Sequence, residues 1–248
     1  MTPFCAEPLP GIPEIRPGDD LAALLAAAAA RLPDAGLRAH DVLAVAHKAV
    51  AKAEGRVVRL ADVVPGERAR ALAAEHGKDP RLVELILAES AELLRADAGR
   101  FIARTRHGFV CANAGVDQSN AGADAHAVLL PLDPDASARA LRARLGCAVV
   151  VSDSFGRAWR IGQAEVAIGC AGLAPVEDWR GRPDAGGRIL AATHVAVADE
   201  AAAAADLARA KDSAEPAVRL RGLERHVLAD DGPGAAALLR APEHDLFG

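Results

Sequence analysis

The sequence contains no tyrosine, and aromatic residues make up only 3% of its 248 positions. Because hydrophobic residues still account for 51% of the chain, the core must consist mainly of aliphatic side chains. The four cysteines, Cys5, Cys111, Cys147 and Cys170, are widely separated, and no pair has the C-x-x-C spacing. This spacing excludes a zinc ribbon and a thioredoxin-type site, and it predicts a reduced cytoplasmic protein.

Long hydrophobic runs and excess basic charge are also missing. The alanine-rich stretch 21–32 is shorter than the roughly 20 residues that a transmembrane helix requires, and the N-terminus lacks the basic and hydrophobic segments of a signal peptide. The net charge of −5 and the pI near 5.9 argue against a nucleic-acid-binding domain. We therefore expect a soluble protein that binds neither nucleic acids nor membranes.

Several common catalytic and nucleotide-binding motifs are absent. The chain has no P-loop and no G-x-G-x-x-G, H-E-x-x-H or G-x-S-x-G sequence. Lysine is rare as well, because only Lys48, Lys52, Lys78 and Lys211 occur among the 29 basic residues. These absences exclude a P-loop enzyme and make each lysine worth locating.

The pattern of hydrophobic runs and turn residues mixes helices and strands without strict β–α–β alternation. This mixture predicts an α+β protein, with mixed sheets and flanking helices, in a single domain over 1–248 whose tail covers 224–248. Helices are expected over 21–31, 47–53, 66–76, 81–96, 134–145 and 198–210. Strands are expected over 41–46, 56–60, 101–105, 109–111, 127–130, 147–152 and 217–220. The segments 154–163 and 177–188 are expected to be loops.

The segment Gly115-Val-Asp-Gln-Ser-Asn120 is the first candidate site. It follows a predicted strand and holds a carboxylate, a hydroxyl and two amides within six residues. Hard cations such as Mg²⁺ and Mn²⁺ prefer oxygen ligands, often carboxylates together with substrate phosphates. Asp117 and Asn120 are therefore candidates for such a site. The structural alternative is an Asx turn, in which both side chains bond only to nearby backbone groups.

A second candidate covers 152–163. A hydrophobic strand delivers Asp153 and Ser154 at its carboxyl end, where open α/β sheets bind their ligands. Arg157 and Arg160 follow within the same segment, and guanidinium groups bind phosphate or carboxylate in a bidentate manner. A metal-binding aspartate beside arginines is common in phosphoryl chemistry. The alternative is an Asp–Arg ion pair that stabilises the loop, with Trp159 as a packing anchor.

A third candidate is the pair of Lys48 and Lys52. They lie at i and i+4 of a short predicted helix, so they share one face. Two like charges there are mildly unfavourable unless an anion lies near both, whereas the alternative is a solvated face. His47 is a weaker candidate, since a lone histidine is usually structural. Glu215 could bind a metal, but a surface position is favoured for it.

Five motifs, in matching order, resemble those of the coenzyme F420 γ-glutamyl ligases. They are Gly-Ile-Pro-Glu-Ile-Arg-Pro-Gly-Asp-Asp (11–20), Ala-His-Lys-Ala-Val-Ala-Lys-Ala-Glu-Gly-Arg (46–56), Ala-Asn-Ala-Gly-Val-Asp-Gln-Ser-Asn (112–120), Leu-Leu-Pro-Leu-Asp-Pro-Asp (129–135) and Ser-Asp-Ser-Phe-Gly-Arg-Ala-Trp-Arg-Ile-Gly-Gln (152–163). The tail 238–247 is similar to the junction after which some members continue into a nitroreductase-like domain. The resemblance therefore implies the stand-alone form of the ligase.

Members of that family attach L-glutamate to the lactyl carboxylate of a deazaflavin coenzyme and add further glutamates by γ-linkage. The resemblance implies GTP as co-substrate and Mg²⁺ or Mn²⁺ as cofactor, with K⁺ as an additional candidate. It also implies a mixed α+β fold assembled as an intertwined homodimer. The expected partners are the deazaflavin precursor, L-glutamate and GTP.

Carried over to matching positions, the resemblance implies Asp117, Asp153 and Ser154 as metal ligands. It places the GTP site at Ile12, Pro13, Glu14, Ile15, His47, Lys52 and Asn120. The family often has serine where this chain has His47, so that contact differs here. We add Lys48, Arg157 and Arg160 as candidates for catalytic neutralisation of phosphate charge.

The chemistry of amide formation suggests the mechanism. A carboxylate must be activated before an amine attacks it, and transfer of the GTP γ-phosphoryl group would give an acyl phosphate. The main alternative is a metal-dependent phosphohydrolase that acts on a nucleotide or phosphorylated metabolite, and it predicts phosphate release without glutamate. A non-catalytic deazaflavin-binding protein is a third possibility, and it predicts binding without turnover.

Overall fold

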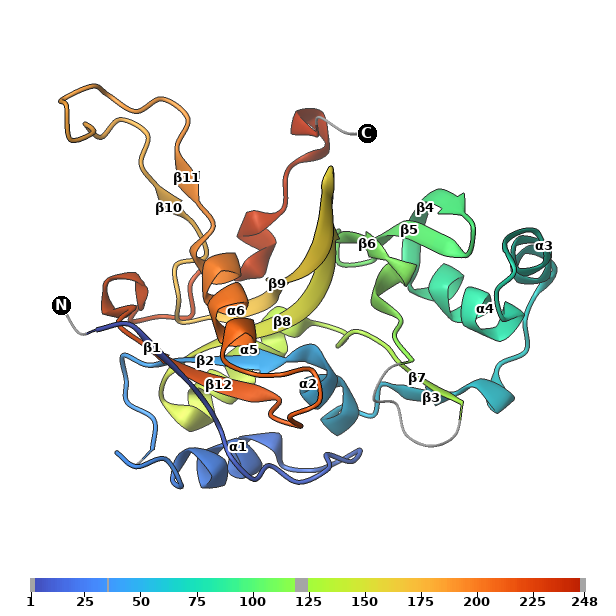
Figure 1. Cartoon of the computed structure of the whole chain (residues 1–248), viewed down its shortest axis with the longest axis horizontal. Coiled ribbons are helices and arrows are strands. Elements are labelled where there is room, and N and C mark those ends of the chain that lie inside the picture. Colours follow the sequence, from blue (N-terminus) through green and yellow to red (C-terminus); the bar gives the residue numbers. More distant parts are fainter. Residues whose placement is uncertain (1–2, 35, 119–124, 246–248) are drawn as a thin grey trace.

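A five-stranded sheet forms the centre of the molecule in the computed structural model, which describes residues 3–34, 36–118 and 125–245 (Figure 1). The strand order is β1-β12-β2-β8-β9, and only β2 and β8 run parallel. The bounds are Cys5–Pro8 for β1, Val42–Ala46 for β2, Ala148–Arg157 for β8, Arg160–Ala171 for β9 and Ala217–Arg221 for β12.

Helices cover both faces of this sheet, which explains the continuous hydrophobic run of β2. Leu43 and Val45 pack in one core with α1, α2 and α5, whereas Val42 and Ala44 pack in another with α6. Successive side chains of a strand point to opposite faces, so each must be hydrophobic here. The helix bounds are Leu21–Ala29 for α1, His47–Ala53 for α2, Pro134–Leu145 for α5 and Val197–Leu207 for α6.

A smaller region with its own core lies to one side, on the right of Figure 1. The helices α3 (Glu67–His76) and α4 (Pro80–Glu89) pack there against the sheet β4-β5-β6, around the buried Phe101 and Ile86. The strands β3 and β7 pair with each other between this region and the central sheet. The strand bounds are Val57–Arg59 for β3, Ser90–Asp97 for β4, Arg100–Thr105 for β5, Val110–Ala112 for β6 and His126–Val128 for β7.

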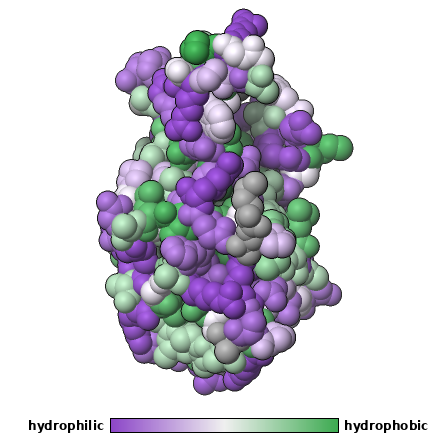
Figure 2. Space-filling model, turned by 90° about the vertical axis from the view of Figure 1, so that its left-hand side faces the viewer, coloured by the Kyte–Doolittle hydropathy of each residue, from purple (hydrophilic) through white to green (hydrophobic). Residues whose placement is uncertain are grey.

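An arm projects from the body and carries the short paired strands β10 (Glu177–Asp178) and β11 (His194–Val195) at its base (Figure 1). In the side view of Figure 2, hydrophilic residues cover most of the visible face and hydrophobic residues form small separate groups. None of the described helices is both long enough and hydrophobic enough to cross a membrane. The remaining elements are the 3₁₀ segments Leu60–Asp62, Asn113–Gly115, Glu224–His226, Ala235–Leu238 and Pro242–His244.

The α+β class with mixed sheets and flanking helices is confirmed, and the helices expected from residues 21 and 134 begin there as α1 and α5. Asp20 caps α1 by accepting the N–H of Ala23, and Asp133 caps α5 by accepting that of Ala136. Such caps satisfy backbone donors that have no partner inside the helix. Pro80 occupies the first turn of α4, where a missing N–H costs nothing.

The expected helix over 81–96 is wrong in its second half. The helix α4 ends at Glu89, and Ser90–Asp97 forms β4, which pairs with β5. Hydrogen bonding to a neighbouring strand therefore overrides the helical propensity of this segment. A turn with positive φ at Ala98 and Gly99 joins the two strands.

Two expected loops also contain strands. The segment 154–163 is the tip of the long hairpin of β8 and β9, and 177–188 includes β10. Glycine and arginine in the first of these suggested a loop, but cross-strand pairing continues to Arg157 and Arg160. The strands β1 and β11, and the part of β9 after residue 163, had no expected counterpart.

Candidate functional site

An open cavity of about 1030 Å³ lies where β2 ends and β8 leaves its pairing with β2. The two strands are parallel and Ala46 pairs with Ser152, so the residues that follow each of them meet at one edge of the sheet. The wall consists of Ile12, Pro13, Glu14, Ile15, Ala46, His47, Lys48, Ala49, Lys52, Asp117, Ser152, Asp153, Ser154, Gln163, Glu165, Asp206, Arg209, Ala210, Lys211, Asp212, Ala214, Glu215 and Pro216.

His47 and Asp153 meet at the base of this cavity. The Nδ1 atom of His47 lies 3.1 Å from Oδ1 of Asp153, and the histidine side chain is only 3% exposed. The same aspartate oxygen accepts the backbone N–H of Ser154 at 2.7 Å. The Nε2 atom of His47 is buried and has no hydrogen-bond partner among the described residues. The histidine therefore contacts the Asp153 carboxylate through Nδ1, while its second nitrogen is enclosed by the protein.

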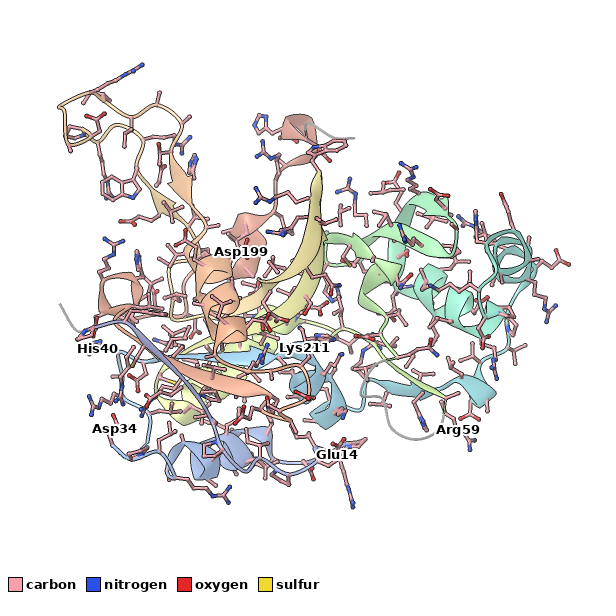
Figure 3. The ribbon with its side chains drawn as sticks, in the orientation of Figure 1. Glu14, Asp34, His40, Arg59, Asp199 and Lys211 are labelled. Carbon is pink, nitrogen blue, oxygen red and sulfur yellow. The ribbon has the colours of Figure 1, made fainter. Side chains whose placement is uncertain are left out.

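The two lysines of α2 reach carboxylates on other segments. Lys48 Nζ lies 2.7 Å from Asp117 Oδ2, and Lys52 Nζ donates to Glu14 Oε1 at 2.6 Å. Because the lysines are four residues apart, their charges lie on one side of the short helix. Figure 3 shows Glu14 on the loop before α1 and Lys211 on the segment after α6, close to α2. Three of the four lysines of the chain thus line one cavity.

A second charged group, on the hairpin, completes the wall. Ser154 on β8 pairs directly with Glu165 on β9, and its hydroxyl donates to Glu165 Oε1. Lys211 Nζ donates to Ser154 Oγ at 2.8 Å and lies 3.5 Å from Glu165 Oε1. Arg209 Nη2 lies 3.3 Å from Glu165 Oε2. Side chains of both signs of charge therefore line the cavity, which suits a polyanion bound together with a cation.

The cavity brings together most of the residues that the sequence singled out. Ile12 to Ile15, His47, Lys48, Lys52, Asp117, Asp153 and Ser154 all line it. Glu215, for which a surface position was favoured, has a half-buried side chain on the same wall. Asn120 lies outside the described residues.

Arg157 and Arg160 do not line the cavity. They lie at the exposed tip of the β8–β9 hairpin, where Arg157 Nη2 donates to the carbonyl of Ile161 at 2.9 Å. The alternative of Trp159 as a packing anchor is wrong, because its side chain is 87% exposed. The hairpin extends to residue 157 through strand pairing, and this carries the tip away from the strand ends.

Four functional candidates were missed: Glu165, Asp206, Arg209 and Lys211. For Lys211, the low number of lysines in the chain was a signal that could have identified it. No comparable signal marks Glu165, because its position opposite Ser154 depends on the register of the hairpin. Nothing in the sequence distinguishes Arg209 from the other arginines. Its contact with Glu165 depends on the packing of α6, which precedes it.

The cysteine near the site is not suited to nucleophilic chemistry. Burial raises the pKa of the Cys111 thiol to about 12, and the negative charge of Asp153 adds to this shift. Because the thiolate is the reactive form, a thiol with such a pKa stays protonated and inert near neutral pH. The chemistry of the cavity therefore depends on its carboxylates, hydroxyls and cations.

The oxygen-rich wall suits a hard divalent cation. Asp153, Ser154 and Glu165 place carboxylate and hydroxyl oxygens on one side, and Asp117 lies beside Lys48. Among the described residues, no group of three or more His, Cys, Asp or Glu side chains is arranged to enclose a metal. Mg²⁺ usually takes one or two carboxylates and completes its shell with water and substrate phosphates. The donor set fits that pattern.

Comparison with known proteins places the sequence among ligases. The profile of the F420-0:Gamma-glutamyl ligase family matches residues 11–222. The Coenzyme F420:L-glutamate ligase of Methanopyrus kandleri is 43% identical over 97% of this chain and 96% of its own length. The enzyme of the same name from Methanothermobacter thermautotrophicus is 45% identical over 96% of both chains. That from Haloarcula marismortui is 41% identical over 95% of this chain and 92% of its own.

Proposed function

This chain belongs to the F420-0:gamma-glutamyl ligase family, and from that premise we propose that it joins L-glutamate to F420-0 by an amide bond. The observation that carries the proposal is similarity above 40% over nearly the whole length of relatives named for this activity. The cavity supports it chemically, because cations and carboxylates suited to phosphoryl transfer face one another there.

GTP is the proposed source of activation. An oxygen of the F420-0 carboxylate attacks the γ-phosphorus, the bond to the β-phosphate oxygen breaks, and GDP leaves. The amine of L-glutamate then attacks the carbonyl carbon of the acyl phosphate and loses a proton, and inorganic phosphate departs. Addition of further glutamates by γ-linkage repeats the same sequence on the new terminal carboxylate.

The residues of the cavity have separable roles in this proposal. Lys48 and Lys52, now paired with Asp117 and Glu14, exchange these partners for phosphate oxygens and neutralise their charge. Residues 12–15, with His47 and Asn120, surround the nucleotide. K⁺ remains an additional candidate cofactor.

A divalent cation, Mg²⁺ or Mn²⁺, would be held by Asp117, Asp153 and Ser154. When bound, it would supply positive charge that offsets the negative charge developing on the phosphate groups. His47 prepares this site by keeping the Asp153 carboxylate turned toward the cavity.

We further propose that the chain forms a homodimer through the hairpin tip. Trp159 and Ile161 are 87% and 97% exposed there, and exposed large hydrophobic side chains commonly mark contacts between proteins. Arg157 and Arg160 lie on the same tip, outside the cavity of their own chain, so these arginines neutralise phosphate only if the tip approaches the cavity of a second copy. Light scattering on the wild type and on a Trp159→Ser, Ile161→Ser double variant tests this. A wild type that remains monomeric would contradict it.

Mass spectrometry of the deazaflavin tests the reaction directly. The protein is incubated with F420-0, L-glutamate, GTP and Mn²⁺, and the product should gain one or more glutamyl units only when GTP is present. Release of phosphate with an unchanged deazaflavin would instead support the phosphohydrolase alternative. Binding of F420-0 without either change would reduce the chain to a deazaflavin-binding protein.

A further inference from the structure

We propose that Glu165 and Arg209 are positioning residues that fix the hydroxyl of Ser154, so that its oxygen is presented to a cation in the cavity. The inference rests on the proposed role of Ser154 as a metal ligand. It concerns two residues that the sequence did not single out and that line the same cavity wall as Ser154.

The position of Glu165 follows from the register of the hairpin. Glu165 on β9 lies directly opposite Ser154 on β8, so the two side chains share one face of the sheet. The Glu165 side chain is only 4% exposed. Burial of a carboxylate is costly unless charged partners surround it. The charged carboxylate of Glu165 therefore needs a cation beside it in the cavity wall.

Arg209 supplies that compensation from the segment after α6. Its side chain is 9% exposed, and its Nη2 lies 3.3 Å from Glu165 Oε2. Its Nη1 donates to the carbonyl of Pro216 at 3.2 Å, just before β12 begins. The guanidinium thus ties the end of α6 and the start of β12 to the buried carboxylate. It holds Glu165 from the side away from Ser154.

The contacts of Ser154 determine how its hydroxyl is oriented. An ammonium group donates hydrogen bonds and accepts none, so the Ser154 oxygen must accept from Lys211. The single hydroxyl hydrogen must then point elsewhere, and the carboxylate of Glu165 receives it. The oxygen lone pairs are consequently left for cations. In this structure Lys211 donates to the Ser154 oxygen. A divalent ion bound to that oxygen would need the hydroxyl hydrogen to point toward Glu165 in the same way.

This arrangement makes a quantitative expectation. Groups that orient a metal ligand from behind typically change metal affinity or activity about 10–100-fold when they are replaced. Glu165→Gln keeps the size of the side chain but removes the charge that compensates Arg209. We therefore expect the dissociation constant of Mn²⁺, measured by electron paramagnetic resonance on the protein without substrates, to rise about 10–100-fold. Ligation kcat should fall similarly, with an unchanged KM for F420-0.

A double-mutant cycle separates positioning from general stabilisation. If Glu165 acts through the Ser154 hydroxyl, Glu165→Gln should change Mn²⁺ affinity strongly in the wild type and hardly at all in the Ser154→Ala background. Arg209→Lys should restore part of the affinity that Arg209→Met removes, because it keeps a cation beside Glu165. Equal effects of Glu165→Gln in both backgrounds would overturn the proposal.

A matched control exists in a half-buried Glu–Arg pair outside the cavity. Glu89 and Arg56 are 2.7 Å apart, both are 18% exposed, and neither lines the cavity. Glu89→Gln should lower thermal stability without changing Mn²⁺ affinity. A loss of affinity in this control, unchanged affinity in Glu165→Gln, or a wild type that binds no Mn²⁺ would each refute the positioning role. Because Mn²⁺ binding is measured without ligation, a failed ligase assay with intact Mn²⁺ results would overturn only the proposed function.

Discussion

His47 and Asp153 follow the point where the parallel pairing of β2 and β8 ends, and their Nδ1 and Oδ1 atoms lie 3.1 Å apart. Each is the residue directly after a paired position, Ala46 or Ser152. Sheet topology therefore creates the contact, since parallel neighbours deliver their carboxyl ends to the same edge. The cavity is built around this pair.

The first prediction concerns Asp153 itself. Asp153→Asn keeps the shape of the side chain and the hydrogen bond to Ser154 but removes the negative charge that would hold a cation. Ligation should fall about 100-fold or more, while circular dichroism and thermal melting stay close to those of the wild type. If mass spectrometry shows that this variant glutamylates F420-0 as fully as the wild type, Asp153 has no role in the mechanism.

The second prediction separates the two lysines of α2. Loss of a charge-assisted hydrogen bond costs about 1.5–3 kcal/mol, so Lys52→Met should raise the KM for GTP about tenfold or more. Lys48→Met should mainly lower kcat, since we assign Lys48 to the reacting phosphate. Lys78→Met is the control, because Lys78 bonds to Gly99 and Asn113 far from the cavity. Steady-state kinetics with varied GTP distinguish the three variants.

The third prediction tests the packing of the central sheet against α5. A Cβ atom at Gly169 on β9 would overlap the backbone carbonyl of Pro134 at the start of the helix. Gly169→Ala should therefore lower the free energy of unfolding by about 1–3 kcal/mol. Gly156 lies on the same hairpin with no atom within 4 Å of such a Cβ, so Gly156→Ala should stay within about 0.5 kcal/mol. Urea denaturation that ranks the two variants in the opposite order would contradict the packing described.

The fourth prediction uses the half-buried carboxyl of Asp199 on α6 (Figure 3). Burial raises the pKa of Asp199, although it accepts the N–H of Ala167 at 2.9 Å, which acts in the opposite direction. The unfolded chain therefore ionises first, and stability falls as pH rises from about 4 through the folded pKa. Asp199→Asn has no such loss, so its stability relative to the wild type should increase over that range.

The matched control for this effect is Asp199→Ala. Removal of the acceptor leaves the Ala167 N–H without its partner and should cost about 1–3 kcal/mol at every pH. Urea denaturation between pH 4 and pH 7 measures all three proteins. Parallel curves for the wild type and the asparagine variant would show that Asp199 carries no burial penalty.

Local chemistry accounts for what the sequence predicted correctly. Asp20, Asp133 and Pro80 mark helix starts because capping depends on residues within one turn. The hydrophobic run of β2 indicated a buried strand for the same kind of local reason. These features need no information about distant segments.

Long-range pairing accounts for the errors. The composition of Ser90–Asp97 is compatible with a helix, but the segment forms a strand because it pairs with β5. The segment 154–163 contains turn residues, but pairing between β8 and β9 continues through most of it. The resulting long hairpin places Arg157 and Arg160 away from the cavity. Neither outcome is decided within the segment concerned.

The amino-acid sequence by itself determined the class of fold, the starts of several helices and the motif residues Lys48, Lys52, Asp117 and Asp153. Only the tertiary structure decided that Lys211 and Arg209 join them and that Glu165 lies opposite Ser154 and accepts its hydroxyl hydrogen. The physical reason is the range of the interactions. Caps and periodicity act over a few residues, whereas the wall of the cavity forms when strand register and helix packing bring distant charges together.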